Sequence, residues 1–213
     1  MRGLLVRVGA DQTEAGGRWN GPLDTNSGKF VYVPIVESHP IRPDFKWHYE
    51  QLETPLSRMN VALPENLRNM KMHLDPDFSY LTYGDQGQRA KQIKAKVGSG
   101  DLLVFYSSLR DQNSRQLIYA IIGLFLVNTI ALARQIPEQD WHQNAHTRRR
   151  LDISAEDIVI YGHPNSSGRL ERCLPIGDVG PVLRQFLTRA DNRFDGLVHL
   201  TVSHKLIRGQ VPE

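Results

Sequence analysis

The stretch that most constrains the fold runs from Gly100 to Val127 and is the most apolar part of the chain. A Gly-Asp turn leads into the apolar run 102–106, a polar connection spans 107–116, and a longer apolar run extends over 117–127. The two runs are predicted to be core strands joined by a loop. Both alternating sets of side chains in the first run are apolar, so we expect both faces of that strand to be covered.

The second run contains Gly123, and a glycine inside a strand indicates a bulge, a bend or a close backbone approach. We therefore expect a curled or barrel-like sheet rather than a flat one. A membrane helix is the alternative for this run, but a bilayer span needs about 20 apolar residues. The run is short, is interrupted by Asn128 and Thr129, and is rich in strand-favouring side chains, which favours a buried strand and no membrane partner.

Length and composition are those of an ordinary globular protein. The 213 residues are 40% hydrophobic and 23% charged, which is enough for one sizeable core, so we expect a single domain over residues 1–213. The net charge of +3 permits a polyanionic partner without requiring one. The single cysteine, Cys173, fits a reducing compartment, and the N-terminus has no secretory apolar segment, so a cytoplasmic location is expected.

The remaining apolar patterns predict further strands and helices around this pair. Strands are expected at 3–8, 30–36, 157–161 and 169–176, with an apolar series at Leu197, Leu200 and Val202. Helices are expected at 45–52, at 87–97 with Asp85 as its cap, at 137–149 and at 181–189. Together these elements predict an α+β fold, with a curled or barrel-like mixed or antiparallel sheet and flanking helices.

A glycine-rich polar loop follows the first expected strand. Gly16 and Gly17 permit close approach of a ligand to the backbone, and Asp11, Trp19 and Asn20 supply polar or aromatic groups. The alternative is a long solvated hairpin connection, because the glycine spacing matches neither phosphate-binding nor dinucleotide-binding loops.

The sequence MHLDPDF, residues 72–78, is the clearest candidate for chemistry. If this segment is extended, His73, Asp75 and Asp77 point to one side, and such a set could act as acid and base or bind a divalent cation. The alternative is an Asp-Pro-Asp turn that caps the following backbone. The pattern singles out no metal ligands and leaves the cofactor open.

Two basic segments could contact phosphates. The expected helix at 87–97 carries a basic face, whose alternative is simple solvation. Residues 148–150 are all arginine, and they lie close in sequence to His142 and His146, which suggests a phosphate site. The alternative is that the arginines interact with the negative end of the helix expected at 137–149.

Several segments together resemble one known family. They are GDLLVFYSSLR, IIGLFLV, HLDPDF and SGRLERCLPIG, with an opening strand, a Gly-Gly loop and a VPI strand, and they cover nearly the whole chain. In this combination the chain resembles the third type of nucleotide modification associated domain. The family is associated with genes that modify DNA bases, so the resemblance implies a nucleotide or nucleic-acid setting and association with other base-modification proteins. The sequence Tyr-Ser-Ser-Leu-Arg after the central strand departs from the family pattern.

The central pair is also similar to a segment of the compact PUA-like β-barrels, named after pseudouridine synthases and archaeosine transglycosylases. Relatives of those barrels hold a base outside its stack, against aromatic and polar groups. Trp19, Trp47 and Tyr106 are candidates for such a stacking role here. The alternative is that all three aromatic side chains belong to the core.

Two functions from different classes follow. The first is a module that binds a nucleotide or a modified base. Its candidate ligand-binding residues are Arg7, Asp11, Gly16, Gly17, Trp19, Asn20, Tyr106, Arg110, His146, Ser167 and Arg169. The second is an enzyme that alters a base or nucleotide by acid–base or metal-assisted chemistry with His73, Asp75 and Asp77. One cysteine excludes the zinc-deaminase pattern, and no serine lies in a nucleophile elbow.

Overall fold

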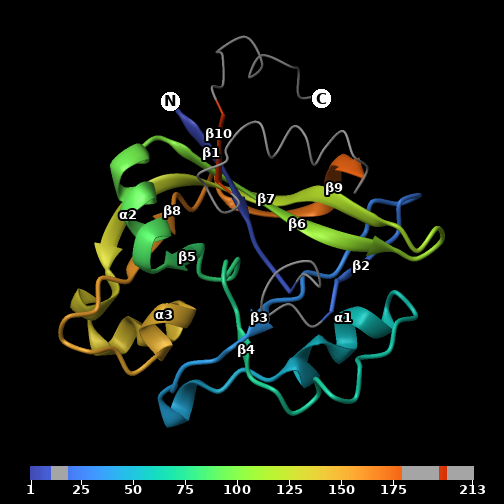
Figure 1. Cartoon of the computed structure of the whole chain (residues 1–213), viewed down its shortest axis with the longest axis horizontal. Coiled ribbons are helices and arrows are strands. Elements are labelled where there is room, and N and C mark those ends of the chain that lie inside the picture. Colours follow the sequence, from blue (N-terminus) through green and yellow to red (C-terminus); the bar gives the residue numbers. More distant parts are fainter. Residues whose placement is uncertain (11–18, 179–196, 201–213) are drawn as a thin grey trace.

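The computed structural model describes residues 1–10, 19–178 and 197–200, which form a mixed α+β fold (Figure 1). The strands are β1 (Gly3–Arg7), β2 (Pro22–Leu23), β3 (Ile35–Val36), β4 (Met72–His73), β5 (Thr82–Asp85), β6 (Leu102–Asp111), β7 (Leu117–Leu132), β8 (Ile158–Gly162), β9 (Gly168–Asp178) and β10 (Leu197–Leu200). Eight of them form one sheet in the order β10-β1-β6-β7-β8-β5, with β2 beside β6 and β9 beside β7. β1 and β2 run parallel to β6, while the other pairs in this sheet are antiparallel.

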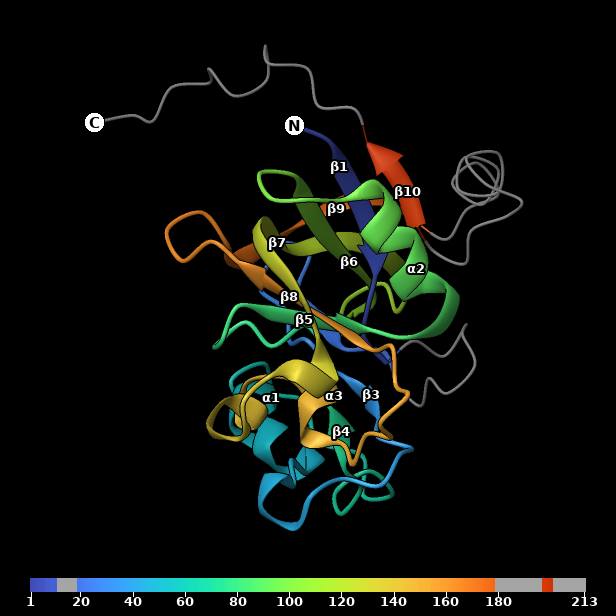
Figure 2. The same ribbon diagram turned by 90° about the vertical axis from the view of Figure 1, so that its left-hand side faces the viewer.

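The helices are short, and most of them lie on one side of the large sheet. The α-helices are α1 (Glu53–Ser57), α2 (Gly87–Lys96) and α3 (Ala145–Arg148), and the 3-10 helices are η1 (Pro43–Phe45), η2 (Tyr49–Leu52), η3 (Ala133–Gln135) and η4 (Glu138–Gln143). α1, α3 and the β3–β4 pair form a layer below the sheet, while α2 lies at its flank (Figure 2). Among the described helices, none is long and apolar enough to cross a membrane.

The predicted central pair is confirmed, and it is longer than expected. β6 continues to Asp111 and β7 continues to Leu132, so the predicted loop shrinks to a tight hairpin connection around residues 112–116. Leu103 and Phe105 face the main hydrophobic core, while Tyr106 joins a smaller cluster with Leu5 and Tyr119. Apolar side chains therefore pack against both faces of β6, as its sequence predicts.

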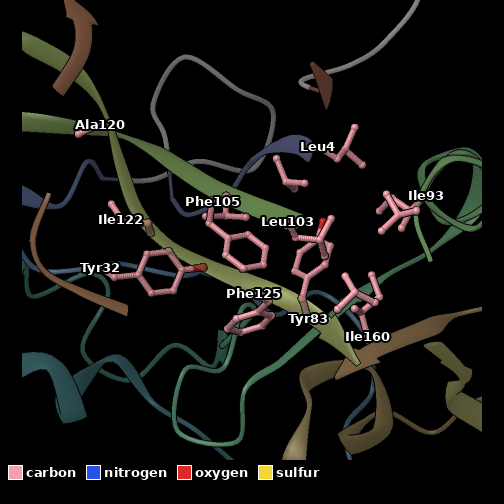
Figure 3. Close-up of a cluster of buried hydrophobic side chains, with 14 of the residues drawn as sticks. Leu4, Tyr32, Tyr83, Ile93, Leu103, Phe105, Ala120, Ile122, Phe125 and Ile160 are labelled. Carbon is pink, nitrogen blue, oxygen red and sulfur yellow. The ribbon is translucent and has the colours of Figure 1, made fainter. Parts of the chain in front are cut away.

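The main core is built around a group of aromatic rings (Figure 3). Phe105 and Phe125 have ring centroids 4.8 Å apart, and Phe78 packs edge-on against both of them. A second core joins the short helices to the segment before β3, with Tyr49, Leu56 and Leu67 among its fully buried members. The two cores hold the layer of short helices against the sheet.

Gly123 marks a close approach, as its position in the run predicts. A Cβ added at Gly123 would lie 2.4 Å from the Phe78 ring and 2.8 Å from the carbonyl oxygen of Gly168. The pairing register also shifts beside this glycine, between Phe105 and Tyr106 in the β6–β7 pair and between Ile121 and Gly123 in the β7–β9 pair. The absent side chain therefore lets Phe78 enter the core across an irregular part of the sheet.

Other expectations for strands are met in part. The expected strand at 30–36 is wrong for most of its length, because only β3 is a strand there and Phe30 makes an isolated bridge to Leu23. The strands expected at 157–161 and 169–176 correspond to β8 and β9. β10 begins and ends at Leu197 and Leu200. Val202 and the helix expected at 181–189 lie outside the described residues.

The helix expectations are correct for α2 and wrong in two other places. The helix expected at 45–52 is replaced by η1, η2 and α1, shifted along a proline-rich segment. The helix expected at 137–149 is divided into η4 and α3, because Asn144 is extended and its side chain accepts a hydrogen bond from the His146 amide. Asp85 is not the cap of α2, since Gln86 holds that position without a side-chain cap bond.

The barrel-like expectation is not confirmed. In the described part of the chain, β10 and β5 stand at the two ends of the sheet path and pair only with β1 and β8. The α+β class and the mixed sheet are confirmed, while the sheet described here is open.

Replacing Gly123 with alanine should destabilise the fold. The new methyl group must displace the Phe78 ring or the backbone at Gly168, and overpacking of this kind costs about 1–3 kcal/mol. Gly98 is the matched control, because an added Cβ there meets no atom within 4 Å. Urea unfolding should show a loss for Gly123→Ala and little change for Gly98→Ala. Equal stabilities for the two variants would contradict the proposed packing.

The turn between β6 and β7 should make the fold acid-sensitive. The Ser114 hydroxyl and amide and the Thr25 hydroxyl donate hydrogen bonds to Asp111 and lower its pKa from 3.8 to about 2. Because the folded pKa is depressed, this stabilisation is complete above about pH 4 and is lost as the pH falls through about 2. Asp111→Asn should lower the free energy of unfolding at pH 7 by about 1–2 kcal/mol. The difference in unfolding free energy between wild type and Asp111→Asn should vanish as the pH falls through about 2. Asp152 is exposed, so Asp152→Asn should show neither the loss at pH 7 nor the change with pH.

Candidate functional site

Two histidines and one aspartate converge between the sheet and the layer of short helices. His73 ends β4, Asp75 follows it by two residues, and His146 lies in α3. All three are buried, and one potential ligand atom from each lies within 4.8 Å of the others. The Nε2 atoms of His73 and His146 are 3.8 and 3.6 Å from Oδ2 of Asp75, which is too long for hydrogen bonds. The two Nε2 atoms and Oδ2 of Asp75 therefore converge without forming hydrogen bonds to one another.

The other nitrogen of each imidazole meets a carboxylate. Nδ1 of His73 lies 2.7 Å from Oε2 of Glu37, and Nδ1 of His146 lies 2.6 Å from Oδ2 of Asp157. A carboxylate accepts hydrogen bonds, so each Nδ1 carries the proton and each Nε2 keeps its lone pair. The two outer carboxylates thus select the same tautomer for both rings.

Arg149 links these outer carboxylates. Its Nε donates to both oxygens of Glu37 at 3.2 and 3.1 Å, and its Nη1 lies 3.9 Å from Oδ2 of Asp157. Nη1 also donates to the Gln86 side chain at 3.1 Å. Nη2 lies 3.1 Å from Nδ1 of His73, but the shorter contact to Glu37 takes the imidazole proton. Arg149 therefore supports the pairs from outside.

Asp75 is held by neutral donors. The Gly84 amide donates to its carboxylate at 2.9 Å, and the Asn144 side chain donates at 3.1 Å. Gly84 has to be a glycine here, because a Cβ would lie 2.3 Å from the His146 ring and 2.7 Å from Oδ1 of Asn144. These bonds connect the segment after β4 with β5 and with the start of α3.

Burial and hydrogen bonding shift the pKa values in this cluster in different directions. Burial raises the pKa of Asp75 well above its usual value, although Gly84 and Asn144 oppose the shift. Burial also lowers the pKa of His73. It lowers the pKa of His146 to about 4, although the hydrogen bond that His146 donates to Asp157 opposes this shift. Burial would raise the pKa of Glu37, but its contacts with His73 and Arg149 outweigh that effect and lower it strongly. Both imidazoles are therefore neutral near pH 7.

Asp77 belongs to a different arrangement. One of its oxygens accepts hydrogen bonds from the amides of Ser79 and Tyr80, and the other pairs with Nη2 of Arg148 at 2.7 Å. Arg148 is itself buried, with its guanidinium 4.8 Å from the centre of the Trp47 ring. The turn interpretation is therefore correct for Asp77, while His73 and Asp75 converge with His146 instead.

The helix-end interpretation of the arginine run is wrong. Arg148 and Arg149 are buried and form ion pairs with Asp77 and Glu37, which lie far away in the sequence. α3 has only four residues, so its dipole is small and interacts little with the arginines at its C-terminal end. The expected proximity of His146 to the run is confirmed by the Arg149 contacts, but here they belong to a side-chain network.

The other predicted ligand-binding residues lie in several settings. The guanidinium of Arg7 lies 5.1 Å from the Tyr119 ring centre, and Tyr106 packs against the same ring. Arg110 donates to the backbone of the β6–β7 turn. Ser167 accepts a bond from the Leu126 amide, Asn20 donates to the carbonyl of Ser108, and Trp19 packs on the second core. Asp11, Gly16 and Gly17 lie outside the described residues.

Arg169 lines an open cleft of about 460 Å³. Its guanidinium lies 4.5 Å from the Phe30 ring centre and donates to the Phe30 carbonyl at 2.7 Å. Lys29 and Arg58 add positive charge to the lining, and Glu171 adds negative charge. Three cationic side chains therefore line the cleft beside apolar ones, and cationic side chains can bind a phosphate group.

The sequence interpretation missed the groups that complete the cluster. Glu37, Asn144 and Asp157 were not considered as site residues, because each looks like an ordinary polar residue at the edge of an element. Glu37 is 36 residues from His73. A weak signal exists, since Glu37 directly follows the short strand β3 and Asp157 directly precedes the buried strand β8. Neither signal identifies the partner histidine.

Comparison with known proteins identifies the family. A family model described as nucleotide modification associated domain 3 matches residues 2–185. This range contains the whole cluster and the cleft. No curated protein and no solved structure matches the chain.

Replacing Asp77 with asparagine should destabilise the fold rather than act on the cluster. The change leaves the buried Arg148 guanidinium without its carboxylate, and breaking such a pair costs about 3–5 kcal/mol. A second change, Arg148→Met, should recover part of the loss in an Asp77→Asn background. Denaturant unfolding of both single variants and the double variant measures this coupling. A stable Asp77→Asn variant, or a double variant less stable than both single ones, would contradict it.

Proposed function

Because the chain belongs to the nucleotide modification associated domain 3 family, we propose that it chemically alters a nucleotide or a nucleic-acid base at the cluster of His73, Asp75 and His146. The family supplies the nucleotide setting, and the cluster supplies groups for chemistry. The reaction is acid–base or metal-assisted.

The observation that carries this proposal is the convergence of buried polar atoms that do not bond to one another. The Nε2 atoms of His73 and His146 lie 3.8 and 3.6 Å from Oδ2 of Asp75, and all three residues are buried. Buried polar groups cost folding energy unless they are satisfied. A cluster whose inner atoms stay available, while its outer atoms are fixed, is typical of reactive sites with shifted pKa values.

The neighbouring residues have positioning roles in this proposal. Glu37 and Asp157 fix the orientation of the imidazoles, and Arg149 holds both carboxylates. Gly84 and Asn144 orient Asp75. A neutral imidazole with a free Nε2 can accept a proton, and a buried carboxyl with a raised pKa can hold one.

The cleft at Arg169 favours a second role, which is to bind the phosphate of the substrate. Lys29, Arg58 and Arg169 offer positive charge for a phosphate group. A pure binding module would use this cleft and would not need the cluster. The two roles are separable by substitution.

The test is to incubate the protein with nucleotides and with short single- and double-stranded oligonucleotides, and to follow nucleoside masses by mass spectrometry. Wild type should change the mass of a nucleoside. Asp75→Asn and His146→Gln should each lower the rate by at least about 100-fold, because each removes a group that acts on the substrate. Arg169→Ala should weaken substrate binding and leave the rate at saturation close to wild type.

Matched controls are Asp152→Asn and His163→Gln, whose side chains are exposed. Both should keep full activity. The enzyme proposal fails if wild type leaves every substrate unchanged while Arg169→Ala weakens nucleotide binding. That result would support a binding module instead.

A further inference from the structure

We infer that His73, Asp75 and His146 bind one divalent first-row transition metal ion through two imidazole nitrogens and one carboxylate oxygen. This inference deepens the proposed function, because it names the cofactor of the same cluster. It can nevertheless hold even if the protein modifies no nucleotide.

The positions of the three ligand atoms fit a metal ion. In a zinc or iron site, bonds of about 2.0–2.2 Å place neighbouring ligand atoms about 3.0–3.6 Å apart. Here Oδ2 of Asp75 lies 3.8 Å from Nε2 of His73 and 3.6 Å from Nε2 of His146. One potential ligand atom from each of the three residues lies within 4.8 Å of the other two. The two rings meet edge to face with centroids 5.0 Å apart, so their planes approach from different directions. The two distances to Asp75 are within about 0.2 Å of this range, and a separation of 4.8 Å would have to shorten by about 1.2 Å to complete the site.

The carboxylates behind the histidines are the second, independent observation. Metal-binding histidines usually donate their other ring N–H to a carboxylate or carbonyl, which fixes the tautomer and increases the basicity of the ligand nitrogen. Both histidines show this arrangement, with Glu37 at 2.7 Å and Asp157 at 2.6 Å. A purely structural network of ion pairs would not require both Nε2 atoms to point toward Asp75.

Charge also favours a divalent cation. Among residues 1–10 and 19–178, the connected cluster contains the carboxylates of Glu37, Asp75 and Asp157, and the guanidinium in direct contact with it is that of Arg149. The neighbouring Arg148 is matched by Asp77 and adds no net charge. Carboxylates bind a metal in their deprotonated form, so on metal binding Asp75 gives up any proton it holds. With the three carboxylates ionised and both imidazoles neutral, the formal charge of these groups is −2, the sum of −3 and +1. A doubly charged ion at the centre would balance it.

The donor set indicates which metals fit. Imidazole nitrogens favour zinc, iron, cobalt, nickel and copper over calcium and magnesium, which take oxygen ligands. Two histidines and one carboxylate occur both in zinc enzymes and in non-haem iron(II) enzymes, and three protein ligands leave positions for water or substrate. These three ligands are therefore typical of a catalytic metal site, whereas a structural site has all of its coordination positions filled by protein ligands.

The test uses metal-depleted full-length protein titrated with Co²⁺ alone, and in parallel with Zn²⁺ and Fe²⁺ under anaerobic conditions. Wild type should bind one ion per chain, with visible Co²⁺ absorption and a raised melting temperature. His73→Gln and His146→Gln should abolish the spectrum. Glu37→Gln should keep the ligands and weaken binding by about 10–100-fold. His163→Gln and Asp152→Asn should bind like wild type.

Circular dichroism of each variant separates loss of the site from loss of the fold. If wild type binds no more metal than its folded His73→Gln and His146→Gln variants, the inference is overturned. One bound ion without any change in a nucleotide would sustain the metal site and reject the proposed function. If protein treated with a chelator modifies a nucleotide as fast as metal-loaded protein does, the proposed function is sustained and the metal site is rejected.

Discussion

The structure depends on polar and charged groups that are buried between the sheet and the short helices and are paired there. Asp75 accepts bonds from Gly84 and Asn144, and Arg149 bonds to Glu37. These contacts join the segments that follow β3 and β4 to β5 and to the α3 region, which share little regular secondary structure. Unpaired charges at this depth would cost several kcal/mol each, so the segments have to meet in this arrangement. The layer of short helices is specified by polar contacts as well as by the second apolar core.

The sequence predicts the elements whose signal is local. β1, β6, β7 and α2 follow from apolar periodicity, and Gly123 indicates the close approach that Phe78 makes there. The segment 38–70 has many prolines and no clear period, so its short helices could not be placed correctly. The sequence also does not show that the sheet is open, because closure into a barrel depends on whether the two edge strands pair with each other. The extent of the domain stays a prediction.

The site was predictable only in part, for a physical reason. His73 and Asp75 stand two residues apart, so their common direction is visible in sequence. His146 joins them from a different element, and the interpretation of the neighbouring arginines relied on a local helix dipole. The structure replaces that local effect with ion pairs from Arg148 to Asp77 and from Arg149 to Glu37. Partners that are so far apart in the sequence form no recognisable motif with a fixed spacing.

A buried ionic cluster is weak evidence for a role in stability. Well-packed apolar residues of similar volume often stabilise a fold as well as, or better than, a buried ion pair does. The main core, with Phe78, Phe105 and Phe125, shows that this chain can build such packing. The polar cluster therefore needs another explanation. Chemistry supplies it, because reaction and metal binding require polar atoms that are fixed in direction, shielded from water and not already bonded to each other.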